Sequence, residues 1–203
     1  MRRTERKART RARIVEAALE VFARKGYHAA TMDEIAQRSR VSKGALYVHF
    51  PSKQHLFMTL VDGLADMLIR RMQAAMDRAG QSHHRRMRAA IRSGFRLFEQ
   101  HRTVVRLVFF KMSSLGPPFD RKLLEIHQRI VRLIQQELEQ ARAEGSIDLD
   151  DTETVAWMWV GAIHEILMRW LLEPRRRSLM ADYPIVYRTL LRTIGIDARN
   201  DTT

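Results

Sequence analysis

Residues 42–50 read SKGALYVHF and place several side chains capable of chemistry within nine positions. His49 could serve as a general base, but the nearby sequence offers it only serines as partners. Lys43 and Gly44 could begin a phosphate cradle, but such a cradle needs a longer glycine-rich loop. The third interpretation is a helix that contacts nucleic acid, and the flanking sequence favours it.

The flanking residues predict three short helices that would position this stretch. Apolar residues recur at helical spacing from about residue 8 to 24, and Gly26 follows as a stop signal. Thr31 and Glu34 form a capping box that starts a second helix of about two turns. Ser42 can cap a third helix. Its apolar residues are Ala45, Leu46, Val48 and Phe50. Three short helices with a four-residue joint predict a helix-turn-helix unit.

In such a unit the second helix of the pair enters the major groove, and its N-terminal residues reach base edges. Small side chains there let the backbone approach the duplex, and Tyr47 and His49 could donate to phosphate oxygens one turn further on. The predicted contact residues are Ser42, Lys43, Gly44, Ala45, Tyr47, His49 and Lys53. The alternative for Tyr47 is a core position, although Leu46 and Phe50 already supply a buried face.

Residues 10–57 carry a longer pattern, with the segments AALEVFARKGY, TMDEIA and VSKGALYVHFPSK. This stretch resembles the DNA-binding domain of the TetR family of transcriptional regulators over nearly the whole unit. The resemblance implies that DNA is met by Lys43, Gly44, Tyr47, His49 and Lys53. It also implies that Thr31 touches a phosphate.

Arg40 departs from the family pattern, because many relatives have glycine at this point of the turn. If the turn requires a left-handed backbone, a residue other than glycine costs roughly 1 kcal/mol. We predict that Arg40 offsets this cost by reaching a phosphate of DNA.

The chain is strongly basic, with 36 Lys and Arg against 23 Asp and Glu in 203 residues and a formal net charge of +13. Residues 1–53 hold 13 of the basic and 5 of the acidic residues. A polyanionic partner, either nucleic acid or an anionic membrane surface, is expected to meet this part. The segment RRTERKARTRAR is either a solvated face or an arm that enters a minor groove.

The rest of the chain predicts helices almost throughout, so we expect an all-α protein. Their approximate ranges are 52–79, 84–101, 103–113, 119–144, 150–172 and 181–195. We predict a helix-turn-helix domain with a basic N-terminal arm at 1–53, and a helical ligand-binding and dimerisation domain at 54–203. The chain has no cysteine, which excludes disulfides. Acidic residues within the first apolar run argue against a signal peptide, so we expect a cytoplasmic location.

The apolar run at 155–172 contains His164, Glu165 and Arg169, which favours a buried helix over a membrane span. The family resemblance implies that the last two long helices pair with those of a second copy. A homodimer would present two recognition helices about one DNA turn apart and read a palindromic operator in double-stranded DNA. The predicted dimer residues are Trp159, Ile163, Ile166, Trp170, Tyr187, Leu190 and Leu191.

Methionine and aromatic residues beyond residue 53 predict an apolar ligand cavity, with a packed core as the alternative explanation. The candidate pocket residues are Met67, Phe95, Phe98, Val105, Val108, Phe109, Met112, Phe119, Leu123, Ile126, Ile130, Trp157 and His164. Few acidic groups in this set, and the basic segment at 83–88, favour an apolar molecule with an anionic head. The segments FFKMSSLGPPF and AIHEILMRWLLEP are similar to fatty-acid-responsive family members, which implies a long-chain acyl-CoA effector.

The resemblance implies a repressor that a hydrophobic small molecule releases from DNA, and two alternatives stay open. A repressor that senses drugs or aromatic compounds would have the same fold, and a nonspecific nucleic-acid-binding protein would share the basic domain. We expect no enzymatic activity and no required cofactor, because no acid, base and nucleophile converge. A metal site is not expected either, because an HExxH motif would need histidine where Met168 stands.

Overall fold

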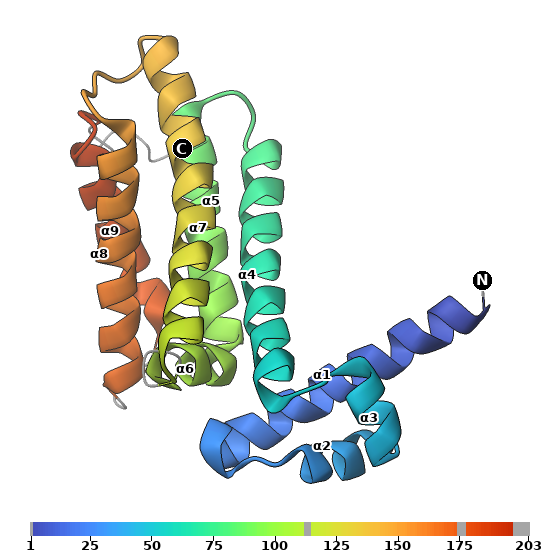
Figure 1. Ribbon diagram of the computed structural model, residues 1–203. Coiled ribbons are helices and arrows are strands. Elements are labelled where there is room, and N and C mark those ends of the chain that lie inside the picture. Colours follow the sequence, from blue (N-terminus) through green and yellow to red (C-terminus); the bar gives the residue numbers. More distant parts are fainter. Residues whose placement is uncertain (1, 112–114, 174–177, 197–203) are drawn as a thin grey trace. The chain divides into compact units, whose positions relative to one another are not determined.

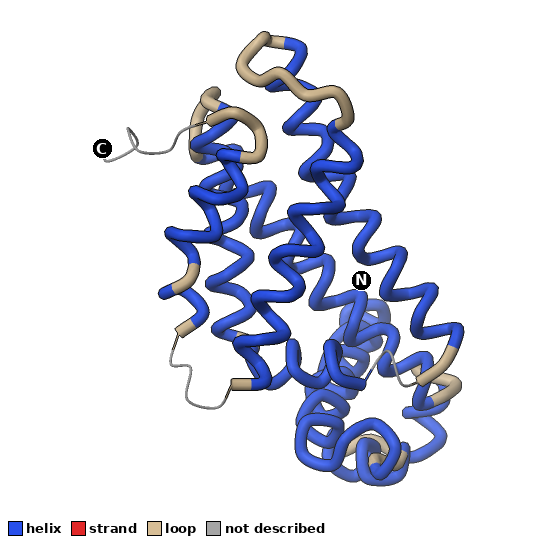
Figure 2. The backbone as a smooth tube through the Cα atoms, turned by 90° about the vertical axis from the view of Figure 1, so that its left-hand side faces the viewer, coloured by secondary structure: helices blue, strands red, loops and turns tan. Residues whose placement is uncertain are grey.

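The computed structural model describes residues 2–111, 115–173 and 178–196. Helices connected by short loops make up the described chain, which contains no strand (Figure 2). The all-α prediction is therefore confirmed. The described residues form two compact units, one from residues up to 65 together with 103–122, and one from 66–102 together with residues from 123 onward.

The first unit contains the predicted helix-turn-helix. Its elements are α1 (Arg2–Ala29), α2 (Met32–Ser39), α3 (Lys43–His49), the first half of α4 (Lys53–Arg78), most of α6 (Arg102–Lys111) and the start of α7 (Pro117–Ala143) (Figure 1). The predicted functional boundary after residue 53 stays a prediction. The first compact unit also includes residues 103–111 and 115–122, which lie beyond that boundary in the sequence and pack with the N-terminal residues.

Local signals in the sequence explain where these helices begin and end. The regular helix α1 is broken at Gly26, whose φ of 77° is favourable only for glycine. Thr31 caps α2 as predicted, because its side chain accepts from the Glu34 amide while the Glu34 side chain accepts from the Thr31 amide. Ser42 caps α3 by accepting from the Ala45 amide at 3.2 Å.

Four aromatic rings form a cluster in the core of the first unit. The Phe57 ring lies 5.4 Å from Phe22, 5.0 Å from Tyr27 and 5.9 Å from Phe119, between ring centres. The pairs with Phe22 and Tyr27 are edge-to-face, an arrangement that adds stability beyond the area that the rings bury. Phe119 is the first buried residue of α7, so this cluster joins α7 to the helix-turn-helix core.

The second unit is a helical bundle. It is built from the rest of α4, α5 (His83–Gln100), most of α7, α8 (Thr152–Leu172), the short 3₁₀ helix η2 (Leu179–Ala181) and α9 (Tyr183–Arg192). At Gly94 α5 packs against α4, where a Cβ would make an ordinary van der Waals contact with Leu68 Cδ1 at 3.5 Å. The Tyr183 hydroxyl donates to the Arg88 carbonyl at 3.2 Å and ties α9 to α5.

By length and composition alone, α8 could cross a membrane, a property that core helices of water-soluble proteins share. In the structure Trp159, Trp170 and Leu171 of α8 are buried, and the Trp159 indole N–H donates to Thr193 at 2.9 Å. Met158 and Leu172, on the other face, are exposed. The helix therefore has one face inside the bundle and one face open.

Candidate nucleic-acid interface

Helix α3 buries one face and exposes the other. Leu46 and Phe50 have no exposed surface, whereas Tyr47 is 41% exposed. The alternative that Tyr47 is a core residue is therefore wrong. Its side chain is open to a partner, and contact with a DNA phosphate stays a prediction.

Val48 is apolar, but it lies on the exposed face of α3. It was grouped with the apolar residues of the third helix, yet its side chain is 77% exposed. At 100° per residue, position 48 lies about 200° away from both Leu46 and Phe50. Helical spacing could have revealed this, and a methyl-bearing side chain beside Tyr47 suits contact with a thymine methyl group.

The joint between α2 and α3 is fixed by Arg40 and Arg13. Arg40 has φ 53° and ψ 45°, so the turn does need a left-handed residue where many relatives have glycine. Its amide donates to the carbonyls of Ala36 and Gln37, which closes the end of α2. Arg13 of α1 donates to the Ser39 carbonyl at 3.1 Å. The exposed Arg40 side chain is left to face solvent or DNA.

Two lysines predicted to contact DNA have partners within the chain. Lys43 pairs with Asp33 at 2.8 Å, and this hydrogen bond raises the pKa of Lys43. Lys53 donates to the carbonyls of His28 and Ala30 at 3.0 and 2.9 Å. The Lys53 contacts join the end of α1 to the start of α4, so this lysine has a structural role that the sequence did not reveal.

The remaining predicted contact residues lie on or beside the same helix-turn-helix. A Cβ on Gly44 would meet nothing within 4 Å, so packing inside the chain does not explain the glycine. Ser42 is exposed and Ala45 partly exposed at the start of α3. Thr31 is exposed at the start of α2, and its hydroxyl hydrogen remains able to donate. His49 is half-buried beside the Phe50 ring.

The basic N-terminal segment is helical from Arg2, as part of α1. Arg6, Lys7 and Arg9 are exposed on it, and the Arg11 guanidinium lies 5.1 Å from the centre of the Phe50 ring. An arm in a minor groove remains a prediction, and the structure adds that the segment is helical.

The candidate pocket residues are divided between the two units. In the first unit, Val105, Val108 and Phe119 are buried, and Phe109 is partly exposed. In the second unit, Phe95 and Ile126 are buried, whereas Met67, Phe98, Leu123, Ile130, Trp157 and His164 are partly exposed. Met112 lies outside the described residues. Burial lowers the pKa of His127, and its neighbour His164, whose ring centre lies 5.8 Å away, lowers it further.

The predicted dimer residues lie mostly inside one chain. Ile163 and Ile166 are partly exposed, but the other five side chains are buried in the protomer: Trp159, Trp170, Tyr187, Leu190 and Leu191. A side chain covered by its own chain cannot present its surface to a second copy. The exposed apolar residues of α8 and α9 are Met158, Leu172 and Ile185.

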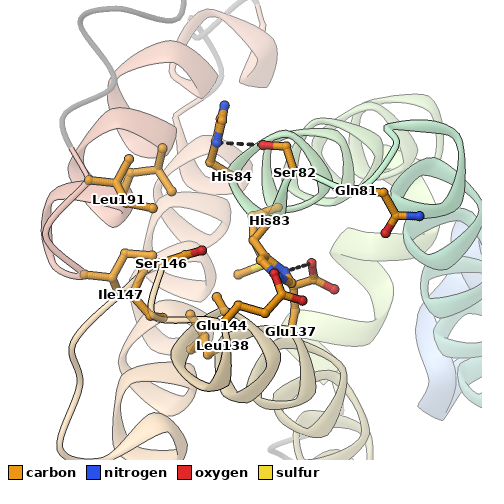
Figure 3. Close-up of a pocket in the computed structure, with 14 residues that line it drawn as sticks. Gln81, Ser82, His83, His84, Glu137, Leu138, Glu144, Ser146, Ile147 and Leu191 are labelled. Atoms are coloured by element: carbon orange, nitrogen blue, oxygen red, sulfur yellow. Dashed lines mark hydrogen bonds and ion pairs between the residues drawn. The ribbon is translucent and has the colours of Figure 1, made fainter.

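Sequence reasoning missed a pocket of about 300 Å³ between the start of α5, the end of α7 and the end of α9 (Figure 3). There His83 lies between two glutamates, with Nδ1 at 2.8 Å from Glu137 and Nε2 at 2.9 Å from Glu144. Arg86 donates to Glu137 at 2.7 Å. Burial by itself would lower the pKa of His83, but the hydrogen bonds to Glu137 and Glu144 outweigh it and raise the pKa. No cluster able to hold a metal ion occurs in the described part of the chain.

Comparison with known proteins assigns both parts of the chain. Residues 14–60 match bacterial regulatory proteins of the tetR family, and residues 80–171 match the tetracyclin repressor-like C-terminal domain.

Relatives and solved structures agree with this assignment. The transcriptional activator FasR of Mycolicibacterium smegmatis is 40% identical over 49% of this chain, and the match spans 45% of FasR. The fatty acid metabolism regulator of Bacillus subtilis is 22% identical over 83% of this chain and 87% of its own length. The crystal structure of FadR from Bacillus subtilis in complex with stearoyl-CoA has a TM-score of 0.81 and 22% identity, covering 90% of this chain and 98% of that one. The chain belongs to the TetR family of transcriptional regulators.

Proposed function

We propose that the protein is a homodimeric repressor that binds a palindromic operator through α3 and is released by a hydrophobic effector. The exposed face of α3 carries this proposal. Tyr47 and Val48 project from a helix whose opposite face, Leu46 and Phe50, is fully buried, and Gly44 is open at its N-terminal end. This arrangement suits insertion into a major groove.

Long-chain acyl-CoA is the leading effector in this proposal. The support is the fold shared with FadR, which was solved with stearoyl-CoA, and the set of partly exposed apolar residues in the second unit. To move a population from 1:99 to 99:1, a ligand must favour one state by about 5.5 kcal/mol. At about 0.8 kcal/mol per buried methylene, an acyl chain needs roughly seven buried methylenes.

The effector test follows from this estimate. Fluorescence anisotropy would follow the protein on labelled DNA from upstream of its own gene, with butyryl-CoA to stearoyl-CoA added. We expect no release by the shortest chains and a steep onset near octanoyl-CoA. Release by cationic dyes with a flat acyl-CoA response would support the drug-sensing alternative instead. Equal affinity for upstream and scrambled duplexes would support a nonspecific nucleic-acid-binding protein.

The sign of regulation needs its own test, since the relative FasR is an activator. We expect the protein to lower transcription of a reporter placed behind its upstream DNA, and long-chain acyl-CoA to restore transcription. Higher transcription in the presence of the protein would show activation.

The structure also changes which residues we propose for the dimer. Gly161 and Ala162 are exposed on α8, and with Met158 and Leu172 they form an open apolar face. Small residues let two helices approach closely, so this face is a better candidate than the buried tryptophans. Ala162→Glu should yield a folded monomer in light scattering, whereas an unchanged dimer would place the interface elsewhere.

A further inference from the structure

A groove between the second half of α4 and α5 is lined by arginines and small residues. Its arginines are Arg71 and Arg78 from α4, and Arg85, Arg88, Arg92 and Arg96 from α5. Alanines and Ser93 occupy most of the remaining lining, and no carboxylate is part of it. The groove measures about 420 Å³, which lies within the usual range of small-molecule sites.

The arginines of α5 form a row along one face of the helix. Arg85, Arg88, Arg92 and Arg96 are three or four residues apart, so their successive Cβ atoms are about 5–6 Å apart on one face of the helix. Like charges at this spacing destabilise a helix. The first turn of α5 also contains no acidic residue, although the helix dipole favours one there. The helix thus carries a charge pattern that its own stability does not require.

Two acidic residues packed near α5 are engaged elsewhere. Glu137 accepts from His83 and Arg86, and Glu99 accepts from the Ser178 hydroxyl and the Leu179 amide. Within the described ranges, no ion pair with a carboxylate is found for Arg78, Arg85, Arg92 and Arg96. The groove therefore has positive charge that the chain itself does not neutralise.

Three contacts hold the walls of the groove in place. Arg71 Nη1 donates to Gln100 Oε1 at 2.8 Å, and the Ser93 hydroxyl donates to the Arg71 carbonyl at 3.2 Å. The Arg88 guanidinium lies 5.9 Å from the centre of the Tyr187 ring, which restricts its orientation. These contacts lower the entropy cost of ordering the arginines around a ligand.

We propose that this groove binds an organic polyphosphate. A guanidinium group can bind two oxygens of one phosphate, and arginines that two helices contribute to one groove fit an anion with several phosphates close together. The alanines in the lining leave space for a nucleoside. Nucleoside polyphosphates and the phosphorylated nucleotide head of coenzyme A share this chemistry. The site goes beyond the effector function proposed above, because it requires no acyl chain.

Isothermal titration calorimetry on the full chain tests the site with inorganic tripolyphosphate, ATP and free CoA. Arg92→Gln should weaken binding roughly tenfold, because a charge-assisted contact is lost, and Arg85→Gln/Arg92→Gln should weaken it further. Arg132→Gln is the matched control. Arg132 is likewise exposed in the middle of a long helix, α7, and has no ion pair in the described structure. Its substitution should leave binding unchanged.

The melting temperature gives a second readout that folding defects cannot imitate. Arg92→Gln removes a positive charge that lies between the like charges of Arg88 and Arg96. The ligand-free protein should therefore melt about 1–2 °C higher. The rise that tripolyphosphate causes should shrink at the same time. Tighter binding of ATP than of CoA would identify a nucleoside polyphosphate as the source, and the reverse would identify the CoA head.

Three results would overturn the proposal. They are no binding of any probe by the natural sequence, an equal loss of probe binding in Arg132→Gln, or groove variants that weaken the binding of duplex DNA and of no probe. None of the probes carries an acyl chain. Failure of this site therefore leaves acyl-CoA-dependent release from DNA to be judged by its own titration.

Discussion

The two basic regions of this chain use their cations in opposite ways. In residues 25–53 of the helix-turn-helix, four of the five lysines and arginines are tied to neighbours, through Lys25–Glu34, Arg38–Glu20, Lys43–Asp33 and the two carbonyl contacts of Lys53. The α4–α5 groove has six arginines and no carboxylate in its lining. Net charge therefore locates a basic region, whereas the positions of the acids decide how much of that charge a partner can use.

This difference also explains why charge counting missed the groove. Residues 66–102 contain nine arginines and three acidic residues, an excess comparable to that of the N-terminal quarter. Averaged over residues 54–203, this excess is diluted by the acidic stretches of the later helices. The +13 charge thus has two centres, and only the first coincides with a recognisable motif.

The largest effect is expected from a variant of Tyr47, which tests whether the helix-turn-helix contacts DNA although most of its cations have partners within the chain. Tyr47→Ala should weaken specific operator binding roughly 100-fold, because a homodimer would lose a contact of about 1–2 kcal/mol twice. Anisotropy with operator and scrambled duplexes would measure this, and light scattering should show an unchanged dimer. Tyr47→Phe separates the hydroxyl from the ring, since a phosphate contact predicts loss in both variants. Normal affinity in Tyr47→Phe would assign the effect to the ring.

A smaller effect should distinguish the two lysines of the same unit. Lys53→Met removes hydrogen bonds to two carbonyls and should lower the free energy of unfolding by about 1–2 kcal/mol. Lys43→Met removes an ion pair whose two side chains are more than 60% exposed, so its cost should stay below about 1 kcal/mol. Urea denaturation compares the two. Equal stability of both variants would mean that the Lys53 contacts are as weak as a surface pair.

A variant of Arg40 measures the stability cost of a residue other than glycine in the left-handed position of the turn. Arg40→Gly should raise the free energy of unfolding by roughly 1 kcal/mol, because glycine adopts the left-handed backbone without strain. If the Arg40 side chain reaches a phosphate, the same variant should bind DNA more weakly and with a smaller salt dependence. Unchanged DNA binding would remove the phosphate contact and leave only the strain.

The sequence predicted the fold well where its signals are local. The capping box at Thr31, the cap at Ser42 and the break at Gly26 act within one turn, so residue identity alone fixes them. It could not reveal contacts between distant segments. Phe119, a candidate pocket residue, packs on Tyr27 and Phe57, and Lys53 donates to carbonyls more than twenty residues away. A single sequence without pairing information contains no sign of such contacts.

The smallest effect is expected at the start of α5, outside the groove, where His83 and Arg86 form hydrogen bonds with glutamates. A protonated His83 can donate to both Glu137 and Glu144, whereas neutral imidazole has one N–H and loses one of these bonds. Because the folded-state pKa is raised above the ordinary value of 6.5, this stabilisation is complete below that value and disappears as pH rises through the raised pKa. His83→Gln should therefore lower the melting temperature by about 2–4 °C at pH 6, corresponding to roughly 1 kcal/mol, and by less at pH 9. Scanning calorimetry at both pH values measures the difference. His101→Gln serves as the control, because it replaces a histidine outside this cluster. A deficit that is the same at both pH values would show that the His83 ring contributes packing and not charge.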